Sequence, residues 1–123
     1  MIIILIEDNE TLAKIYSRAL SLNGYETIYF LGGQQAIHWI VLNDATQIRL
    51  VICDLALPDM SGVDVAVQLR DHCGYRGPIL AMSGAAQLID PAKLEPAHFV
   101  DLLMKPMRLN DLIAAVKQQI GEA

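Results

Sequence analysis

The stretch IIILIED, from Ile2 to Asp8, decides the fold, because a short run of branched apolar residues ends in two carboxylates. Runs of this kind are typical of a strand buried on both faces of a parallel sheet. Three later runs have the same form: Leu50–Cys53 before Asp54, Pro78–Met82 before Ser83, and Val100–Met104 before Lys105. Ligands bind beyond the carboxyl ends of such strands. We therefore expect these polar side chains to meet at one edge of a sheet.

The composition places the chain among ordinary globular domains. Hydrophobic residues make up 54% of its 123 residues, which excludes a disordered segment and suits a sheet covered on both faces. The length is near the commonest domain size, so we expect a single domain over residues 1–123, with no output domain. The net charge of −5 argues against direct nucleic-acid binding, because that function needs a basic surface.

No segment predicts a membrane span or a secretory signal. The longest apolar run, at the N-terminus, is about six residues, whereas a membrane helix needs about 20. No charged region precedes that run, so it does not resemble a signal peptide. The two cysteines, Cys53 and Cys73, suggest no disulfide framework and are typical of a reducing compartment. We therefore expect a cytoplasmic protein that does not bind membranes.

A helical segment follows the first run. Asp8 or Asn9 can cap its start, and Asn23-Gly24 can end it, because both residues tolerate the left-handed conformation at a helix terminus. The apolar residues between them recur at helical spacing and predict one buried stripe. They are Leu12, Ile15, Tyr16, Ala19 and Leu20.

One more strand and four more helices complete the pattern. The strand is predicted at Glu26–Phe30. The helices are predicted at Gln34–Leu42, at Val63–His72, from Asp90-Pro91 to just before Pro96, and at Leu109–Ile120. The helix before Pro96 is expected to be short, because proline stops it after about one turn. In the last helix, the residues expected to face inward are Leu109, Leu112, Ile113, Val116 and Ile120.

Strands that alternate with helices five times indicate an α/β fold of (βα)5 type, with parallel strands and right-handed crossovers. Such a chain favours a flavodoxin-like, doubly wound five-stranded parallel sheet in the order 2-1-3-4-5, with helices on both faces. This order makes the first and third strands neighbours. The carboxylates of Glu7-Asp8 and of Asp54 then lie at the ends of strands about 5 Å apart.

The polar residues at the sheet edge suit phosphoryl chemistry. The carboxylates of Glu7, Asp8 and Asp54 would repel one another, and a divalent cation with oxygen ligands removes that conflict. Magnesium suits the site, because it keeps several waters and binds phosphate oxygens. Asp54 can then act as a nucleophile toward phosphorus. Lys105 would neutralise the transferred group, and Ser83 would donate a hydrogen bond to it.

Four motifs support a family resemblance: Glu7-Asp8-Asn9, Asp54 followed by Leu57–Gly62, Ser83-Gly84, and Lys105-Pro106. On these motifs the chain resembles the receiver domains of bacterial two-component response regulators, close to the single-domain chemotaxis type. The resemblance extends from Ile2 to about Ile120.

The resemblance implies roles for the acidic residues. It makes Asp54 the phosphoryl acceptor. It also implies that Glu7, Asp8, Asp54 and the backbone carbonyl of Ala56 bind Mg²⁺, for which Mn²⁺ can substitute. No other cofactor is expected.

The resemblance also assigns the residues on the later strands. Ser83 becomes the switch hydroxyl, and Lys105 contacts the phosphoryl group through a peptide bond to Pro106 that should be cis. Receivers typically carry Tyr or Phe three residues before this lysine, where the aromatic rotamer reports phosphorylation. Here that position holds Leu102, so the usual coupling between hydroxyl and aromatic ring is in doubt.

The family implies that the phosphoryl group comes from a histidine kinase or a phosphotransfer protein and is lost by slow self-catalysed hydrolysis. We expect no other enzymatic activity. Phosphorylation should then change the binding of an unknown downstream protein. The protein is expected to be a monomer or a weak dimer.

Three alternatives remain open. A nucleotide or cofactor binder could share this fold, but the chain lacks a GxxxxGK loop and a GxGxxG turn after its first strand. A second alternative is an interaction module that works without phosphorylation, which Leu102 makes reasonable. The third is a receiver segment of a hybrid kinase or of a longer regulator.

Overall fold

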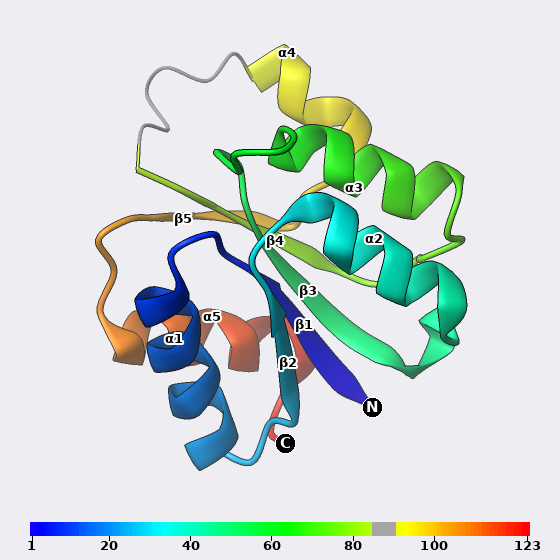
Figure 1. Cartoon of the computed structure of the whole chain (residues 1–123). Coiled ribbons are helices and arrows are strands. Elements are labelled where there is room, and N and C mark those ends of the chain that lie inside the picture. Colours follow the sequence, from blue (N-terminus) through cyan, green and yellow to red (C-terminus); the bar gives the residue numbers. More distant parts are fainter. Residues whose placement is uncertain (85–90) are drawn as a thin grey trace.

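The computed structural model describes residues 1–84 and 91–123. These residues form one parallel sheet in the predicted order β2-β1-β3-β4-β5, which confirms the flavodoxin-like topology (Figure 1). The strands are β1 (Ile2–Ile6), β2 (Thr27–Phe30), β3 (Ile48–Asp54), β4 (Ile79–Ser83) and β5 (Asp101–Met104).

Helices cover both faces of the sheet. Helices α1 and α5 lie on one face, whereas α2, α3 and the short α4 lie on the other (Figure 1). The 3-10 turns η1 (Ala45–Gln47) and η3 (Glu95–Ala97) precede β3 and β5. The helix bounds are α1 (Glu10–Leu22), α2 (Gly33–Leu42), α3 (Gly62–Asp71), α4 (Pro91–Leu94) and α5 (Leu109–Ile120). None of the helices in the described ranges is long and apolar enough to cross a membrane.

The central strands are buried on both faces, as their continuous apolar runs predict. Alternate residues of β1 point to opposite sides, so Ile4 and Ile6 pack against α2 and α3, whereas Ile3 and Leu5 pack against α1 and α5. Each fully buried aliphatic side chain stabilises the fold by about 1.5–3 kcal/mol. The two cores therefore fix the sheet firmly, and with it the position of the carboxyl ends of its strands.

The helix ends follow the predicted chemistry. Asn9, not Asp8, is the N-cap of α1, and its Oδ1 accepts a hydrogen bond from the Leu12 N–H at 3.1 Å. Asn23 is the C-cap, and Gly24 adopts a φ of 88°. The short helix before Pro96 is confirmed as α4, whereas Asp90, its predicted first residue, lies outside the described residues.

Two of the predicted inward positions are wrong. Ile15 is 43% exposed and Leu109 is 41% exposed. Ile15 lies at the flank of the stripe formed by Tyr16 and Leu20, and Leu109 is the first residue of α5. Helical spacing defines the centre of a buried stripe better than its edges, because the width of the contact depends on neighbouring elements.

Arg70 of α3 holds together the turns that lead into β4 and β5. Its guanidinium donates hydrogen bonds to the backbone carbonyls of Tyr75 and Gly77, before β4. It also donates to the carbonyls of Ala97 and His98, before β5. One side chain thus fixes the entry of both strands that complete the sheet edge.

Replacing Arg70 with Met should lower the free energy of unfolding by about 2 kcal/mol, because four carbonyls lose a charged donor. Chemical denaturation would measure the loss. The exposed neighbour Arg76 provides the control, and Arg76→Met should change the stability by no more than about 0.5 kcal/mol. Equal effects of the two substitutions would contradict the role given to Arg70.

Candidate functional site

The sheet register brings the polar residues to one edge. Ile6 of β1 pairs with Cys53 of β3, so Glu7 and Asp54 follow at the same level. Asp54 pairs with Met82 of β4, and Ser83 pairs with Met104 of β5, directly before Lys105. Glu7, Asp54 and Ser83 are only 0%, 3% and 4% exposed. The fold therefore brings these three residues to the same edge and shields them from most of the solvent.

Three carboxylates form a compact cluster. Glu7, Asp8 and Asp54 each offer one oxygen, and these oxygens all lie within 4.8 Å of one another. Asp8 is exposed, whereas the other two are buried, so the cluster opens to solvent on the Asp8 side. The Asn9 N–H donates to Glu7 Oε2 at 3.4 Å.

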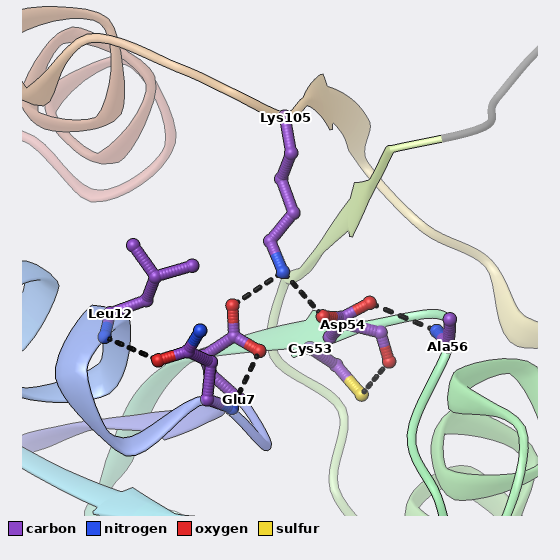
Figure 2. Close-up of polar contacts among 7 residues, drawn as sticks. Glu7, Leu12, Cys53, Asp54, Ala56 and Lys105 are labelled. Atoms are coloured by element: carbon purple, nitrogen blue, oxygen red, sulfur yellow. Dashed lines mark hydrogen bonds and ion pairs between the residues drawn. The ribbon is translucent and has the colours of Figure 1, made fainter.

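The Lys105 ammonium reaches into the cluster from the end of β5, as Figure 2 shows. Its Nζ lies 2.6 Å from Asp54 Oδ2 and also forms an ion pair with Glu7 Oε1. The peptide bond between Lys105 and Pro106 is cis. The lysine, the acid pair and Asp54 thus surround one small volume at the sheet edge.

The pKa of Glu7 is raised to about 7, chiefly by burial. The hydrogen bond with Lys105 opposes this rise, whereas the neighbouring carboxylates of Asp8 and Asp54 add to it. Burial alone would lower the pKa of Lys105, but its hydrogen bonds to Asp54 and Glu7 outweigh that effect and raise it. The lysine therefore stays charged at neutral pH, whereas Glu7 exchanges a proton there.

The residues fit a hard divalent cation. Three carboxylates against one ammonium leave an excess of two negative charges when all four groups are ionised. Oxygen donors and a charge of this size are what Mg²⁺ binds, with waters completing its octahedral shell. Glu7 Oε1 is completely buried, and within residues 1–84 and 91–123 it forms no hydrogen bond besides its contact with the Lys105 ammonium. A buried oxygen of this kind is a suitable ligand.

The loop after β3 holds the other side of Asp54. The Ala56 N–H donates to Asp54 Oδ1 at 2.9 Å (Figure 2). Ala56 also forms an isolated antiparallel bridge with Ser61, and the Gly62 N–H donates to the carbonyl of Leu55 at 3.0 Å. Both oxygens of Asp54 therefore have fixed partners, and the loop that carries Ala56 is closed at its base.

The thiol of Cys53 contacts the backbone of Asp54. Its Sγ donates to the carbonyl of Asp54 at 3.4 Å, and burial raises its pKa far above the ordinary value (Figure 2). The thiol therefore stays protonated. Cys53 and Cys73 are both free cysteines.

Ser83 completes the edge on β4. Its backbone carbonyl accepts the N–H of Lys105 at 2.8 Å, and the carbonyl of the preceding Met82 accepts the N–H of Leu55 at 2.9 Å. These bonds tie the serine to both flanking strands. Ser83 therefore lies on the strand between β3, which carries Asp54, and β5, which leads to Lys105.

Leu102 lies on β5, three residues before Lys105. It pairs with Ala81 of β4 and is half-buried. Together with Leu94 and Phe99, the two residues line a hollow of about 430 Å³ beside η3 and the short α4. An aromatic ring does approach this region, but it belongs to Phe99, before β5 begins.

One residue with a structural role at the site was missed from the sequence. Asp59, in the loop after β3, is not part of the carboxylate cluster. Its carboxylate accepts hydrogen bonds from the first N–H groups of α2. A signal was available, because Gly32 at the start of α2 has no side chain to cap that helix.

Comparison with known proteins identifies the family. The sequence pattern of the response regulator receiver domain matches residues 3–117. The polar-differentiation response regulator DivK of Brucella anthropi is 27% identical over 122 residues, covering 98% of this chain and 97% of that protein.

Solved structures agree with the sequence match. The receiver domain of a sensor histidine kinase from Pseudomonas aeruginosa, solved with magnesium coordinated in its active-site cleft, is 26% identical with a TM-score of 0.83, covering 98% of this chain and 97% of that chain. A CheY-like receiver protein from Methanospirillum hungatei shares the fold with a TM-score of 0.83 at 21% identity, covering 96% and 91%.

The sheet order, the buried acidic edge with its lysine, and the match over residues 3–117 agree with one another. The chain therefore belongs to the family of response regulator receiver domains, which act in two-component signal transduction.

Proposed function

We propose that Asp54 accepts a phosphoryl group from a histidine kinase or a phosphotransfer protein, and that this modification alters the binding of a downstream protein. The main support is the contact between the Asp54 carboxylate and the Lys105 ammonium inside the acidic cluster. That arrangement pairs a nucleophile with a cation that can neutralise an incoming phosphoryl group.

Mg²⁺ would be held by the carboxylates of Glu7, Asp8 and Asp54 and by the backbone carbonyl of Ala56. When bound, the ion would neutralise phosphoryl oxygens and orient them toward the acceptor. The magnesium in the cleft of the Pseudomonas aeruginosa receiver supports this assignment. Mn²⁺, which also prefers oxygen ligands, would substitute.

In the proposed step, a carboxylate oxygen of Asp54 forms a bond to phosphorus while the bond from phosphorus to the donor's imidazole nitrogen breaks. The imidazole keeps the electron pair and takes up a proton. The Lys105 ammonium would neutralise the negative charge on one phosphoryl oxygen, and the Ser83 hydroxyl would donate a hydrogen bond to a second one. Attack of water on phosphorus then breaks the bond between phosphorus and the Asp54 oxygen, which releases inorganic phosphate and returns Asp54 to its carboxylate form.

A receiver domain is not a conventional enzyme. In the proposed cycle the only group that it phosphorylates and dephosphorylates is its own Asp54. The proposed output is protein binding, without direct nucleic-acid contact, because the net charge is −5. We propose that residues 1–123 act as a single domain, as a monomer or a weak dimer, in the cytoplasm.

Treatment with acetyl phosphate and MgCl₂ should add one labile phosphoryl group, on Asp54. Intact-protein mass spectrometry would detect the adduct, and its loss in mild base would identify an acyl phosphate. Asp54→Asn should abolish the adduct, because an amide is a poor nucleophile. Asp64→Asn is the matched control, since Asp64 lies exposed on the next helix, outside the cluster. An adduct that persists in Asp54→Asn would contradict the assignment.

A second function is favoured by one observation. Leu102 replaces the aromatic switch residue and lines an open hollow, so this receiver could bind its partner without a phosphorylation signal. The two functions differ in one measurable property. If partner affinity is the same for the phosphorylated protein, the parent and Asp54→Asn, the interaction module is correct and the switch is not.

Mg²⁺ affinity should increase as the pH rises through about 7, because the ion must displace the proton that Glu7 holds with a pKa of about 7. Below that pKa the gain should approach about tenfold per pH unit. Glu7→Gln should weaken binding and flatten the dependence. Titrations from about pH 6 to about pH 8 would measure both, with Glu10→Gln as the control in the exposed first turn of α1.

Glu7 also contributes to the pH dependence of stability without metal. Glu7 titrates at 4.5 as an ordinary glutamate and at about 7 when folded, so the folded protein binds more protons between these values. The contribution of Glu7 to stability is therefore present below about pH 4.5 and is lost as the pH rises through about 7. Stability that rises over this interval in the parent, relative to Glu7→Gln, would contradict the assigned pKa.

A further inference from the structure

The start of α2 is capped by a residue from another loop. Gly32, the N-cap, has no side chain to accept the first N–H groups of the helix. The carboxylate of Asp59 accepts both instead, from Gly33 at 3.0 Å and from Gln34 at 2.9 Å. Because Asp59 lies in the loop after β3, these bonds join two segments that are 25 and 26 residues apart.

Close packing reinforces this junction. A Cβ atom on Gly33 would lie 2.6 Å from Val65 Cγ2 and 2.7 Å from Met60 Cγ. Only glycine therefore lets α2 approach the loop and the first turns of α3 so closely. The hydrogen bonds of the Asp59 carboxylate and the absence of a side chain on Gly33 both hold the start of α2 close to the loop.

The loop that Asp59 anchors is the one that carries the site. Its base is closed by the bridge between Ala56 and Ser61 and by the bond from Gly62 to Leu55. The Ala56 N–H fixes Asp54 Oδ1. The tip of the loop is fixed by Asp59, which holds it against the N-terminus of α2.

The charge of Asp59 suits this position. The hydrogen bond from Gln34, with a smaller contribution from Gly33, lowers the pKa of Asp59 below its usual value. The carboxylate is therefore ionised at neutral pH. A negative charge at a helix N-terminus is stabilised by the helix dipole.

We infer that Asp59 is a positioning residue for the Asp54 site: by anchoring the loop on α2, it sets the place of the Ala56 carbonyl and the Asp54 carboxylate, and so the affinity for a divalent cation. This inference rests on the proposed magnesium site. Residues that orient metal ligands without touching the ion commonly change metal affinity by about 10–100-fold when they are replaced.

Asp59→Ala should weaken Mg²⁺ binding by about tenfold, at the lower end of that range, because Asp59 acts through the backbone. Titration with MgCl₂, followed by the backbone amide signal of Ala56 in NMR spectra, would give the dissociation constant. Asp59→Asn should have an intermediate effect, since its amide offers one acceptor oxygen for the two N–H groups.

A double variant separates positioning from simple helix capping. Gly32 has φ −148° and ψ 159°, an extended conformation that serine adopts readily. In Asp59→Ala with Gly32→Ser, the new hydroxyl can cap α2 within its own chain segment, while the link to the loop stays broken. We expect this variant to recover the melting temperature of the parent and to keep the weakened Mg²⁺ affinity.

The control is Asp44→Ala, which removes the cap of η1 before β3, at the opposite end of that strand from Asp54. It should lower the melting temperature and leave the Mg²⁺ affinity unchanged. Recovery of Mg²⁺ affinity in the double variant, or an unchanged affinity in Asp59→Ala, would overturn this inference but not the proposed function. A parent protein that does not bind Mg²⁺ would overturn the proposed function and this inference with it.

Discussion

The structure depends on the placement of two buried carboxylates at the ends of adjacent parallel strands. Glu7 and Asp54 cannot separate, because the strands that carry them are locked by cores on both faces of the sheet. Water cannot compensate them fully, because both are buried. Lys105 supplies one compensating charge, and the bonds around β4 and β5 bring it within reach. Much of the fold can thus be understood as a support for one charge cluster.

Three kinds of cation can neutralise the negative charge of that cluster. A proton on Glu7, the ammonium of Lys105 and a divalent ion all reduce the same repulsion, and the proton is held with a pKa of about 7. They therefore compete, and a change in one alters the binding of the others. This competition explains why a lysine can contact both acids and still leave the site suited to a metal ion. Because the pKa of Glu7 is about 7, the charge of the cluster changes with pH near neutrality.

The sequence was sufficient for the sheet, because a strand buried on both faces needs an unbroken apolar run, and such runs are easy to recognise. The bounds of β1 and α5 agree with their predictions. Stripe edges were less predictable, as Ile15 and Leu109 show, since their exposure depends on the packing of other elements. The acidic cluster followed from strand order. The contribution of Asp59 did not, because its partners on α2 are distant in sequence and become neighbours only after folding.

The buried thiol of Cys53 has a consequence for studying this protein in solution. It is adjacent to Asp54 in sequence, fully enclosed, and kept neutral by its surroundings. Alkylating reagents attack the thiolate, so they can modify this cysteine only after the centre of the sheet has opened. Its labelling rate therefore reports how often the core opens next to Asp54, with no added probe. Half-buried Cys73, near the end of α3, supplies a faster internal reference in the same molecule.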